Sequence, residues 1–125
     1  MSAPAFGPFY EILTLWRGST PVLDYVFLTA LTPRASLNLS GCTVRFAATR
    51  HGQINLVKNL VVSPPGGAFP SDWSACLSLT GDETWSFAPG AAGQKYEITV
   101  IDAGGAREVW VAGEIEALGG IDDTP

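Results

Sequence analysis

Residues 42–62 read CTVRFAATRHGQINLVKNLVV, and this stretch decides the fold class. Its first eight residues place apolar side chains on one parity: Cys42, Val44, Phe46 and Ala48. Such period-two alternation is typical of a half-buried β-strand. Residues 50–53 contain a glycine and are expected to form a hairpin turn, after which residues 54–62 return as the partner strand. The stretch therefore predicts an antiparallel pair of strands.

The rest of the chain has the same character, because nine prolines and 14 glycines divide it into runs of strand length. Further strands are expected at residues 11–17, 23–31, 37–39, 73–79, 96–100 and 108–118. Turns are expected at residues 32–36 and 63–67, a second hairpin turn at 102–105, and a turn or one short helical turn at 80–84.

Two of these runs carry more specific predictions. Residues 23–31 are apolar on both parities, which favours a central strand buried on both faces. The last run carries Glu108, Glu114 and Glu116, and such charges are typical of an exposed sheet edge.

About seven or eight short strands at this spacing predict an all-β, antiparallel, immunoglobulin-like β-sandwich, with a small barrel as the alternative. The 125 residues match the usual size of one domain. We expect an extended N-terminal arm at residues 1–10, the sandwich domain at 11–118 and an acidic tail at 119–125.

The composition excludes several classes of protein. Hydrophobic residues make up 46% and charged residues only 15%, which excludes a globally disordered chain. Seven basic and twelve acidic residues give a net charge of −5, which argues against nucleic acid or an anionic membrane as partner. The first ten residues lack the basic start of a signal peptide, so we expect the protein to remain in the cytoplasm of the cell that makes it.

The residues that carry chemistry are few. The single histidine, His51, falls at a hairpin tip, where a general base would lack a pocket and an orienting partner. Asp102 is expected to cap its own turn rather than to bind calcium. Cys42 and Cys76 do not have zinc-ligand spacing and are expected to be free, buried thiols, with a disulfide between strands or subunits as the alternative. We therefore expect no catalytic group, no cofactor and no metal.

The aromatic residues point to a core and to an interface. Four of them lie in strand runs and are expected in the core: Tyr25, Phe27, Phe46 and Tyr96. Three others, Phe6, Phe9 and Tyr10, lie in a segment broken by prolines, which either packs back on the domain or docks on a neighbour. We expect docking on a neighbouring subunit or another protein, with the loop at Pro64 and Pro65 as a second interface candidate.

Five motifs follow one another in a recognisable order. They are Arg17-Gly18-Ser19-Thr20; Leu37-Asn38-Leu39-Ser40-Gly41-Cys42-Thr43-Val44-Arg45-Phe46; Leu77-Ser78-Leu79 with Thr84; Tyr96-Glu97-Ile98-Thr99-Val100-Ile101-Asp102-Ala103-Gly104-Gly105; and Gly113-Glu114-Ile115-Glu116. Together they resemble the small β-sandwich domain of tailed-bacteriophage virion proteins, of the type found at the start of baseplate and receptor-binding-protein scaffolds. Those domains read R-G-D-T and L-D-L-T-G-A-T-V-x-F, so Ser19 and Asn38 stand where aspartates are usual.

The motif residues are expected to be structural. Leu37, Leu39, Val44 and Phe46 fill the core, and Gly41 permits a bend between two strand segments. Asp102 is expected to begin the second hairpin turn. Gly18, Tyr96 and Gly113 are the structural residues expected in the other motifs.

The resemblance implies a non-enzymatic structural protein of the virion. The resemblance favours a place in the tail or baseplate, as an adaptor that binds other virion proteins in multiple copies or as a homo-oligomer. A head decoration or neck protein is the alternative position. From the residues alone, two other classes stay open: an immunoglobulin-like binding module, and a carbohydrate-binding module that uses Trp73 or Trp110 as a platform. The resemblance also implies synthesis in the cytoplasm of a bacterial host.

Overall fold

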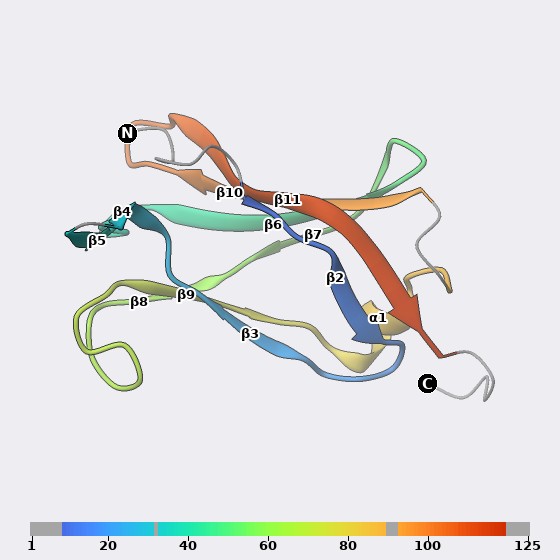
Figure 1. Cartoon of the computed structure of the whole chain (residues 1–125). Helices are drawn as coiled ribbons and strands as arrows, with labels where there is room; N and C mark the ends of the chain where they lie inside the picture. The colour runs from blue at the N-terminus through green and yellow to red at the C-terminus, as the bar shows by residue number, and fades with distance from the viewer. Residues whose placement is uncertain (1–8, 32, 90–92, 120–125) are drawn as a thin grey trace.

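Two β-sheets packed face to face form the fold in the computed structural model, which describes residues 9–31, 33–89 and 93–119 (Figure 1). The strands are β1 (Phe9–Tyr10), β2 (Leu13–Trp16), β3 (Val22–Tyr25), β4 (Leu28–Leu31), β5 (Arg34–Ser36), β6 (Thr43–Arg50), β7 (Gln53–Asn59), β8 (Val61–Ser63), β9 (Ser74–Ser78), β10 (Gln94–Ile101) and β11 (Arg107–Leu118). A short helix, α1 (Gly81–Trp85), follows β9.

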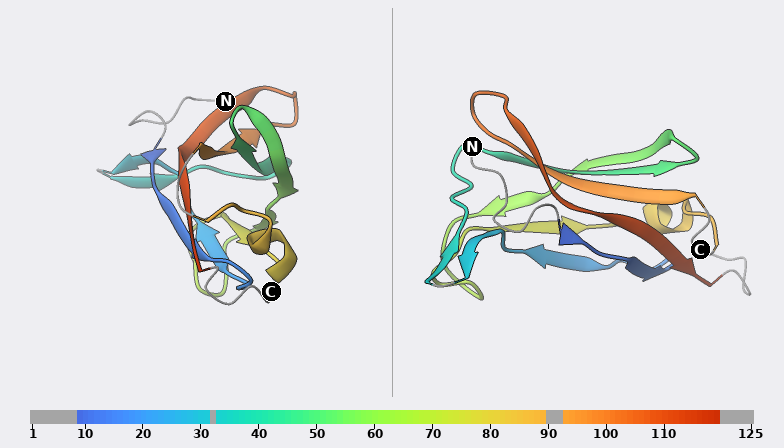
Figure 2. Two further views of the ribbon diagram at one scale, coloured as in Figure 1. Left: turned by 90° about the vertical axis from the view of Figure 1, so that its right-hand side faces the viewer. Right: turned by 45° about the horizontal axis from the view of Figure 1, so that its top comes forward.

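The large sheet has the strand order β1-β11-β10-β6-β7, with β2 also paired to β11. The small sheet has the order β3-β9-β8, and β4 and β5 form a separate two-stranded sheet. Figure 2 shows the two main layers from two further directions. The predicted all-β sandwich is thus confirmed, and the described strands lie in separate sheets rather than in the alternative barrel. Most pairs are antiparallel, but β1 and β2 run parallel to β11.

The hairpin predicted from residues 42–62 is confirmed. β6 and β7 pair antiparallel, and Arg50 and Gln53 close the turn. His51 occupies the turn with a φ of 52°, and its backbone N–H donates to the carbonyl of Gly93. The returning segment is not one strand, however: it leaves the large sheet at Leu60 and continues as β8 in the small sheet.

Two expected strands are placed differently. Residues 23–31 do not form one central strand, because the chain leaves β3 after Tyr25 and resumes as β4 at Leu28. Phe27 lies in this break and is buried, so its apolar character reflects the core rather than a continuous strand. The predicted turn at residues 32–36 instead contains β5, and residues 37–39 are not a strand.

The expected edge position of the last strand is wrong. β11 lies inside the large sheet, between β10 on one side and β1 and β2 on the other. Glu114 and Glu116 are compatible with this position because they alternate with buried residues and lie on the outer face, where Glu114 stands opposite Lys95 of β10. Glu108 stands instead opposite the buried Val100 of β10. Glu114 and Glu116 thus indicate the solvent-facing side of β11 and not an unpaired edge of the sheet.

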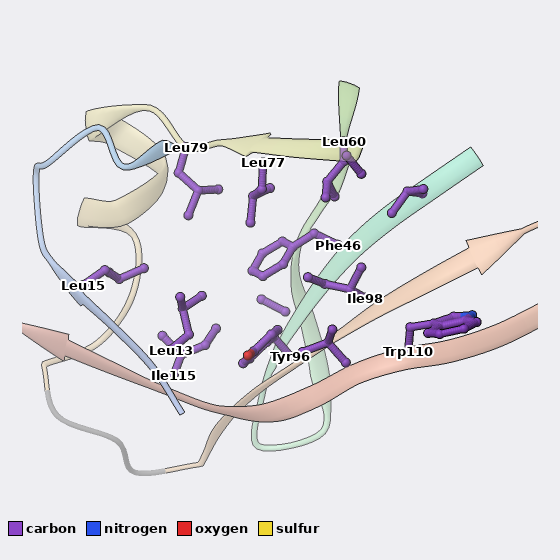
Figure 3. Packing of buried hydrophobic residues seen from close by; sticks show 14 of the residues in the cluster. Leu13, Leu15, Phe46, Leu60, Leu77, Leu79, Tyr96, Ile98, Trp110 and Ile115 are labelled. Carbon is purple, nitrogen blue, oxygen red and sulfur yellow. The ribbon is translucent and has the colours of Figure 1, made fainter. Parts of the chain in front are cut away.

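The core fills the space between the two sheets (Figure 3). β6 and β10 contribute alternate residues that are almost fully buried, among them Phe46, Tyr96 and Ile98. The rings of Phe46 and Tyr96 stack with their centroids 5.7 Å apart. Leu77 of β9 and Leu79, which directly follows β9, face these core residues from the small sheet. Burial of such large side chains is the main force that holds the two layers together.

The prediction that four motif residues lie in the core is confirmed, although the four differ in how far they are buried. Leu39, Val44 and Phe46 are buried, whereas Leu37 is partly buried and packs against the cluster. Gly41 lies in a turn that the Cys42 N–H closes on the Leu39 carbonyl, and it has a φ of +72°. This is the bend expected at Gly41, made by a turn that precedes β6.

Replacing Gly41 with valine should destabilise the protein by about 1–3 kcal/mol, since a β-branched residue is strained at positive φ. Space is not the reason, because the nearest atom to an added Cβ is Ala103 Cβ at 3.6 Å. The measurement is urea unfolding of both proteins. A D-alanine at this position, introduced by peptide ligation, should by contrast restore wild-type stability, and a valine variant of unchanged stability would contradict the strain.

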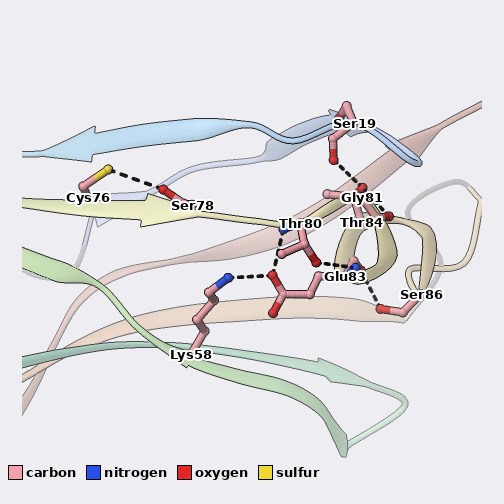
Figure 4. Close-up of polar contacts among 9 residues, drawn as sticks. All are labelled: Ser19, Lys58, Cys76, Ser78, Thr80, Gly81, Glu83, Thr84 and Ser86. Atoms are coloured by element: carbon pink, nitrogen blue, oxygen red, sulfur yellow. Dashed lines mark hydrogen bonds and ion pairs between the residues drawn. The ribbon is translucent and has the colours of Figure 1, made fainter. Parts of the chain in front are cut away.

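The helix α1 fixes one end of the sandwich (Figure 4). Thr80 is its N-cap, and Thr80 and Glu83 form a reciprocal capping box. Lys58 Nζ of β7 donates to Glu83 Oε1 at 2.6 Å, which joins the helix to the large sheet. Burial alone would raise the pKa of Glu83, but the hydrogen bonds from Lys58 and Thr80 outweigh it and lower this pKa. Thr84 is fully buried and donates to the Ser19 carbonyl.

An ion pair fixes the opposite end. Arg34 of β5 makes two hydrogen bonds of 2.8 Å to the carboxylate of Asp72, which precedes β9. These hydrogen bonds lower the pKa of Asp72 below its ordinary value of 3.8. A carboxyl group with a lowered pKa in the folded state stabilises the fold above the unfolded-state pKa, and this contribution disappears as the pH falls through the folded-state pKa.

We therefore expect the difference in stability between wild type and Arg34→Met to be constant from neutral pH down to about pH 5 and to shrink below about pH 4. Denaturant unfolding of both proteins between pH 2 and 7 measures this difference. Because Arg34 is half exposed, salt should also reduce it. A difference that stays the same at pH 2 would show that Arg34 acts through packing alone.

Among the described residues, no helix is long and apolar enough to cross a membrane.

Candidate interaction surface

Large apolar side chains stand in solvent along one margin of the sandwich. We call this margin the β1–β2 edge and define it by Phe9, Tyr10, Ile12 and Trp16. Each of these four side chains is more than half exposed, from 55% for Ile12 to 65% for Tyr10. Monomeric proteins rarely leave so many large apolar groups together in water, and such patches mark interaction sites.

The exposure follows from the strand pattern. β2 alternates strictly, so Leu13 and Leu15 enter the core while Thr14 and Trp16 point outward. Its backbone is held by parallel pairing to β11, in which Trp16 stands opposite Leu118. The aromatic ring of Trp16 is therefore presented from a fixed strand rather than from a loose loop.

A close backbone crossing connects β1 to β2. The Glu11 N–H donates to the Ala112 carbonyl at 2.9 Å, and the Tyr96 hydroxyl donates to the Glu11 carbonyl at 3.1 Å. Burial, with a further contribution from Glu11, raises the pKa of Tyr96, so its phenol stays protonated and keeps donating. Gly113 lies directly beneath Glu11, and this position has no room for a side chain.

The residue after Trp16 anchors the other end of β2. Arg17 Nε donates to the Phe87 carbonyl at 2.8 Å, and its guanidinium lies 4.3 Å from the centre of the Trp85 ring. Arg17 thereby ties the end of β2 to the segment that follows α1. The cation–π contact also explains why Trp85, unlike Trp16, is only partly exposed.

A shallow groove of about 450 Å³ starts at this edge and crosses the outer face of the large sheet. Tyr10 and Ile54 stand at its two ends, and small residues form much of its floor, among them Ala47, Ala112 and Gly113. Lys95, Glu97 and Glu114 supply its charge. The groove thus has a mixed polar and apolar lining, which suits contact with another protein.

The predicted interface residues do not all come together. Phe9 and Tyr10 lie on the β1–β2 edge, and both pair with this chain's own β11. Phe6 lies outside the described residues. Pro64 and Pro65 are exposed in the loop after β8, which belongs to the small sheet. The structure therefore places the two interface candidates on different sheets.

The residues considered for chemistry are placed as follows. His51 is exposed at the hairpin tip. Asp102 Oδ1 accepts from the N–H groups of Gly104 and Ala106, both at 2.9 Å, so it caps its own turn as predicted. In residues 9–31, 33–89 and 93–119, no group of three or more His, Cys, Asp or Glu side chains is arranged to hold a metal.

Both cysteines are free thiols in the structure, as expected, but they are half-buried rather than buried. Cys42 lies just before β6, and Cys76 lies on β9 with its sulfur 3.8 Å from the Ser78 hydroxyl. Burial raises the pKa of Cys42, which keeps this thiol protonated.

The two tryptophans considered as a sugar platform both pack against the core. Trp110 is buried and packs edge-on against Phe27, with ring centroids 5.5 Å apart. Trp73 is partly buried and packs against the core. Trp110 thus presents no open ring face on which a sugar could stack.

Sequence reasoning missed Ile12, Trp16 and Val22 as exposed residues. The alternation Leu13-Thr14-Leu15-Trp16 contained a signal for Trp16, because its parity opposes that of the two leucines. Ile12 and Val22 had no such signal, since both lie where the chain enters a strand.

No protein-family model matches the chain, and no curated protein matches it.

Proposed function

We propose that this chain is a non-enzymatic structural protein of a tailed-bacteriophage virion, and that it acts as a tail or baseplate adaptor. It would bind other virion proteins in multiple copies through the β1–β2 edge. The order of motifs supports the virion assignment, and the fold that the resemblance implied is the fold observed. The observation that carries the interaction role is the exposure of Phe9, Tyr10, Ile12 and Trp16 on one margin.

The geometry of this edge fits a permanent contact. Aromatic residues are enriched in the buried centres of interfaces. Here Trp16 is held on a paired strand, and the Arg17 anchor fixes the end of that strand. A rigid apolar surface loses little conformational entropy when a partner covers it, which favours stable assembly.

Quantitative mass spectrometry of purified virions from the phage that encodes the chain tests the proposal. We expect the chain in the particles at several copies each. Gold labelling of a tagged chain should mark the tail, whereas label over the capsid would assign it to the head decoration alternative. Absence from washed particles would overturn the virion role altogether.

A further inference from the structure

The outer face of β11 carries two carboxylates directly beside the apolar side chains of the β1–β2 edge. Glu116 stands opposite Thr14 in the parallel pairing of β11 to β2, and Trp16 follows on the same face of β2 (Figure 1). Glu114 shares the outer face with Glu116, because Ile115 between them is buried. Since paired strands lie only about 4.8 Å apart, an acidic row runs alongside the apolar row of the edge.

This acidic row has little basic charge beside it. Lys95 of β10 stands opposite Glu114, whereas Glu116 lies beyond the end of the pairing between β10 and β11, so no side chain of β10 stands opposite it. In the part of the chain that the structure describes, neither glutamate takes part in an ion pair. Arg17, at the end of β2, lies instead over the ring of Trp85. The row therefore presents negative charge to any protein that covers the edge.

The groove on the same face continues this combination of apolar and acidic groups. Ala112 of β11 stands between Tyr10 of β1 and Glu97 of β10, so only a small side chain separates the tyrosine from the carboxylate. Glu97 and Glu114 line the groove together with Lys95, which leaves one excess negative charge. The negative charge of this face therefore extends from the edge into the groove.

We infer that the partner of the β1–β2 edge is a protein segment that carries lysine or arginine beside apolar residues. Its apolar side chains cover Tyr10, Ile12 and Trp16, and its cations lie over Glu114 and Glu116. Burial of the apolar groups supplies most of the affinity, whereas the complementary charges set orientation and the rate of association. A second copy of this chain fits less well, because a symmetric contact at this edge would bring two acidic rows together.

Two octapeptides, LLKKLLKK and LLEELLEE, test the chemistry of the edge directly. Alternate residues of an extended peptide share a face, so each face of either peptide carries leucine and charged side chains together. Titration of the isotope-labelled full chain, followed by NMR, gives both the dissociation constant and the binding site. We expect LLKKLLKK to bind at least about tenfold more tightly than LLEELLEE. The shift changes should centre on Ile12, Thr14 and Trp16, and salt should weaken the binding.

A pair of charge reversals separates the acidic row from the net charge of the chain. Glu116→Lys should raise the dissociation constant of LLKKLLKK at least about fivefold. Asp24→Lys is the matched control, because Asp24 is exposed on β3 between Leu23 and Tyr25, which pack against the core, and so faces away from the large sheet. It makes the same change in net charge and should alter the dissociation constant less than about twofold. Equal affinity for the two peptides, or equal effects of the two variants, would overturn the inference.

This inference rests on the proposed function, and purified virions distinguish the failure of one from the failure of the other. Glu116→Lys phage should lose at least about two-thirds of the chain from their particles, and an acidic replacement of a lysine or arginine in one other virion protein should restore it. If Trp16→Glu lowers incorporation while the two peptides bind equally, the edge is the virion contact and only the basic partner is wrong. If Trp16→Glu particles have wild-type composition, the proposed contact itself is wrong.

Discussion

Replacing Gly113 with alanine should destabilise the protein by about 3–5 kcal/mol, among the largest losses that a single methyl group can cause. A Cβ atom at Gly113 would lie 1.7 Å from the Glu11 carbonyl oxygen and 2.7 Å from its carbon. The atoms in the way are backbone, and the Glu11 N–H is bonded to the neighbouring Ala112 carbonyl. The crossing between β1 and β2 would have to move away from β11, and the hydrogen bond from Tyr96 to Glu11 would break.

Thermal unfolding followed by circular dichroism measures this effect, and a loss of this size should lower the melting temperature by roughly 10 °C or more. Gly104→Ala is the control, because Gly104 has an ordinary backbone conformation and its added Cβ would make only a 3.4 Å contact with Asp102 Oδ1. A Gly113→Ala protein that melts with wild type would show that the crossing does not lie where the structure places it.

Replacing Trp16 with glutamate should lower incorporation of the chain into virions by at least about tenfold, since aromatic anchors at interface centres often contribute more than 2 kcal/mol to binding. The ring of Trp16 is 63% exposed, so the stability of the free domain should change by less than about 1 kcal/mol. The separation of these two effects is what distinguishes an intermolecular contact from an internal one. This prediction rests on the proposed function.

Phage carrying the variant gene, complemented and purified, provide the measurement, with the copy number obtained by mass spectrometry and the stability by urea unfolding. Val61→Glu is the matched control, because Val61 is 67% exposed but lies on β8 of the small sheet. Should both variants enter particles as wild type does, the β1–β2 edge would not be the virion contact. Equal losses for both would indicate a general effect of the added charge.

The parts of the fold that sequence reasoning predicted are those encoded by neighbouring residues. The β6–β7 hairpin follows from strict alternation and a turn of four residues, and the hairpin after β10 follows from the cap at Asp102. Both signals are local, so no knowledge of distant partners is needed. The break at Phe27 was missed because apolar residues on both parities hide where a strand ends.

The candidate surface was only partly predictable. Phe9 and Tyr10 were identified by the prolines near them, yet their pairing to β11 is non-local and leaves no mark in adjacent residues. The groove depends on the register of strands that are far apart in sequence, which brings Ala47 and Ala112 to either side of Glu97. The position of β11 inside the sheet was missed for the same reason, since its partners β1 and β2 lie at the other end of the described chain.

The parallel pairing of β2 to β11 has a consequence for the order in which the protein folds. Leu13 stands opposite Ile115, about a hundred positions later, so this contact has a very high sequence separation. On the ribosome, β2 has no partner strand until β11 has been synthesised and has left the exit tunnel. The β6–β7 hairpin can form long before that point. The apolar residues of β1 and β2 therefore remain uncovered during most of synthesis, and closure of this margin should be the last and slowest step of folding.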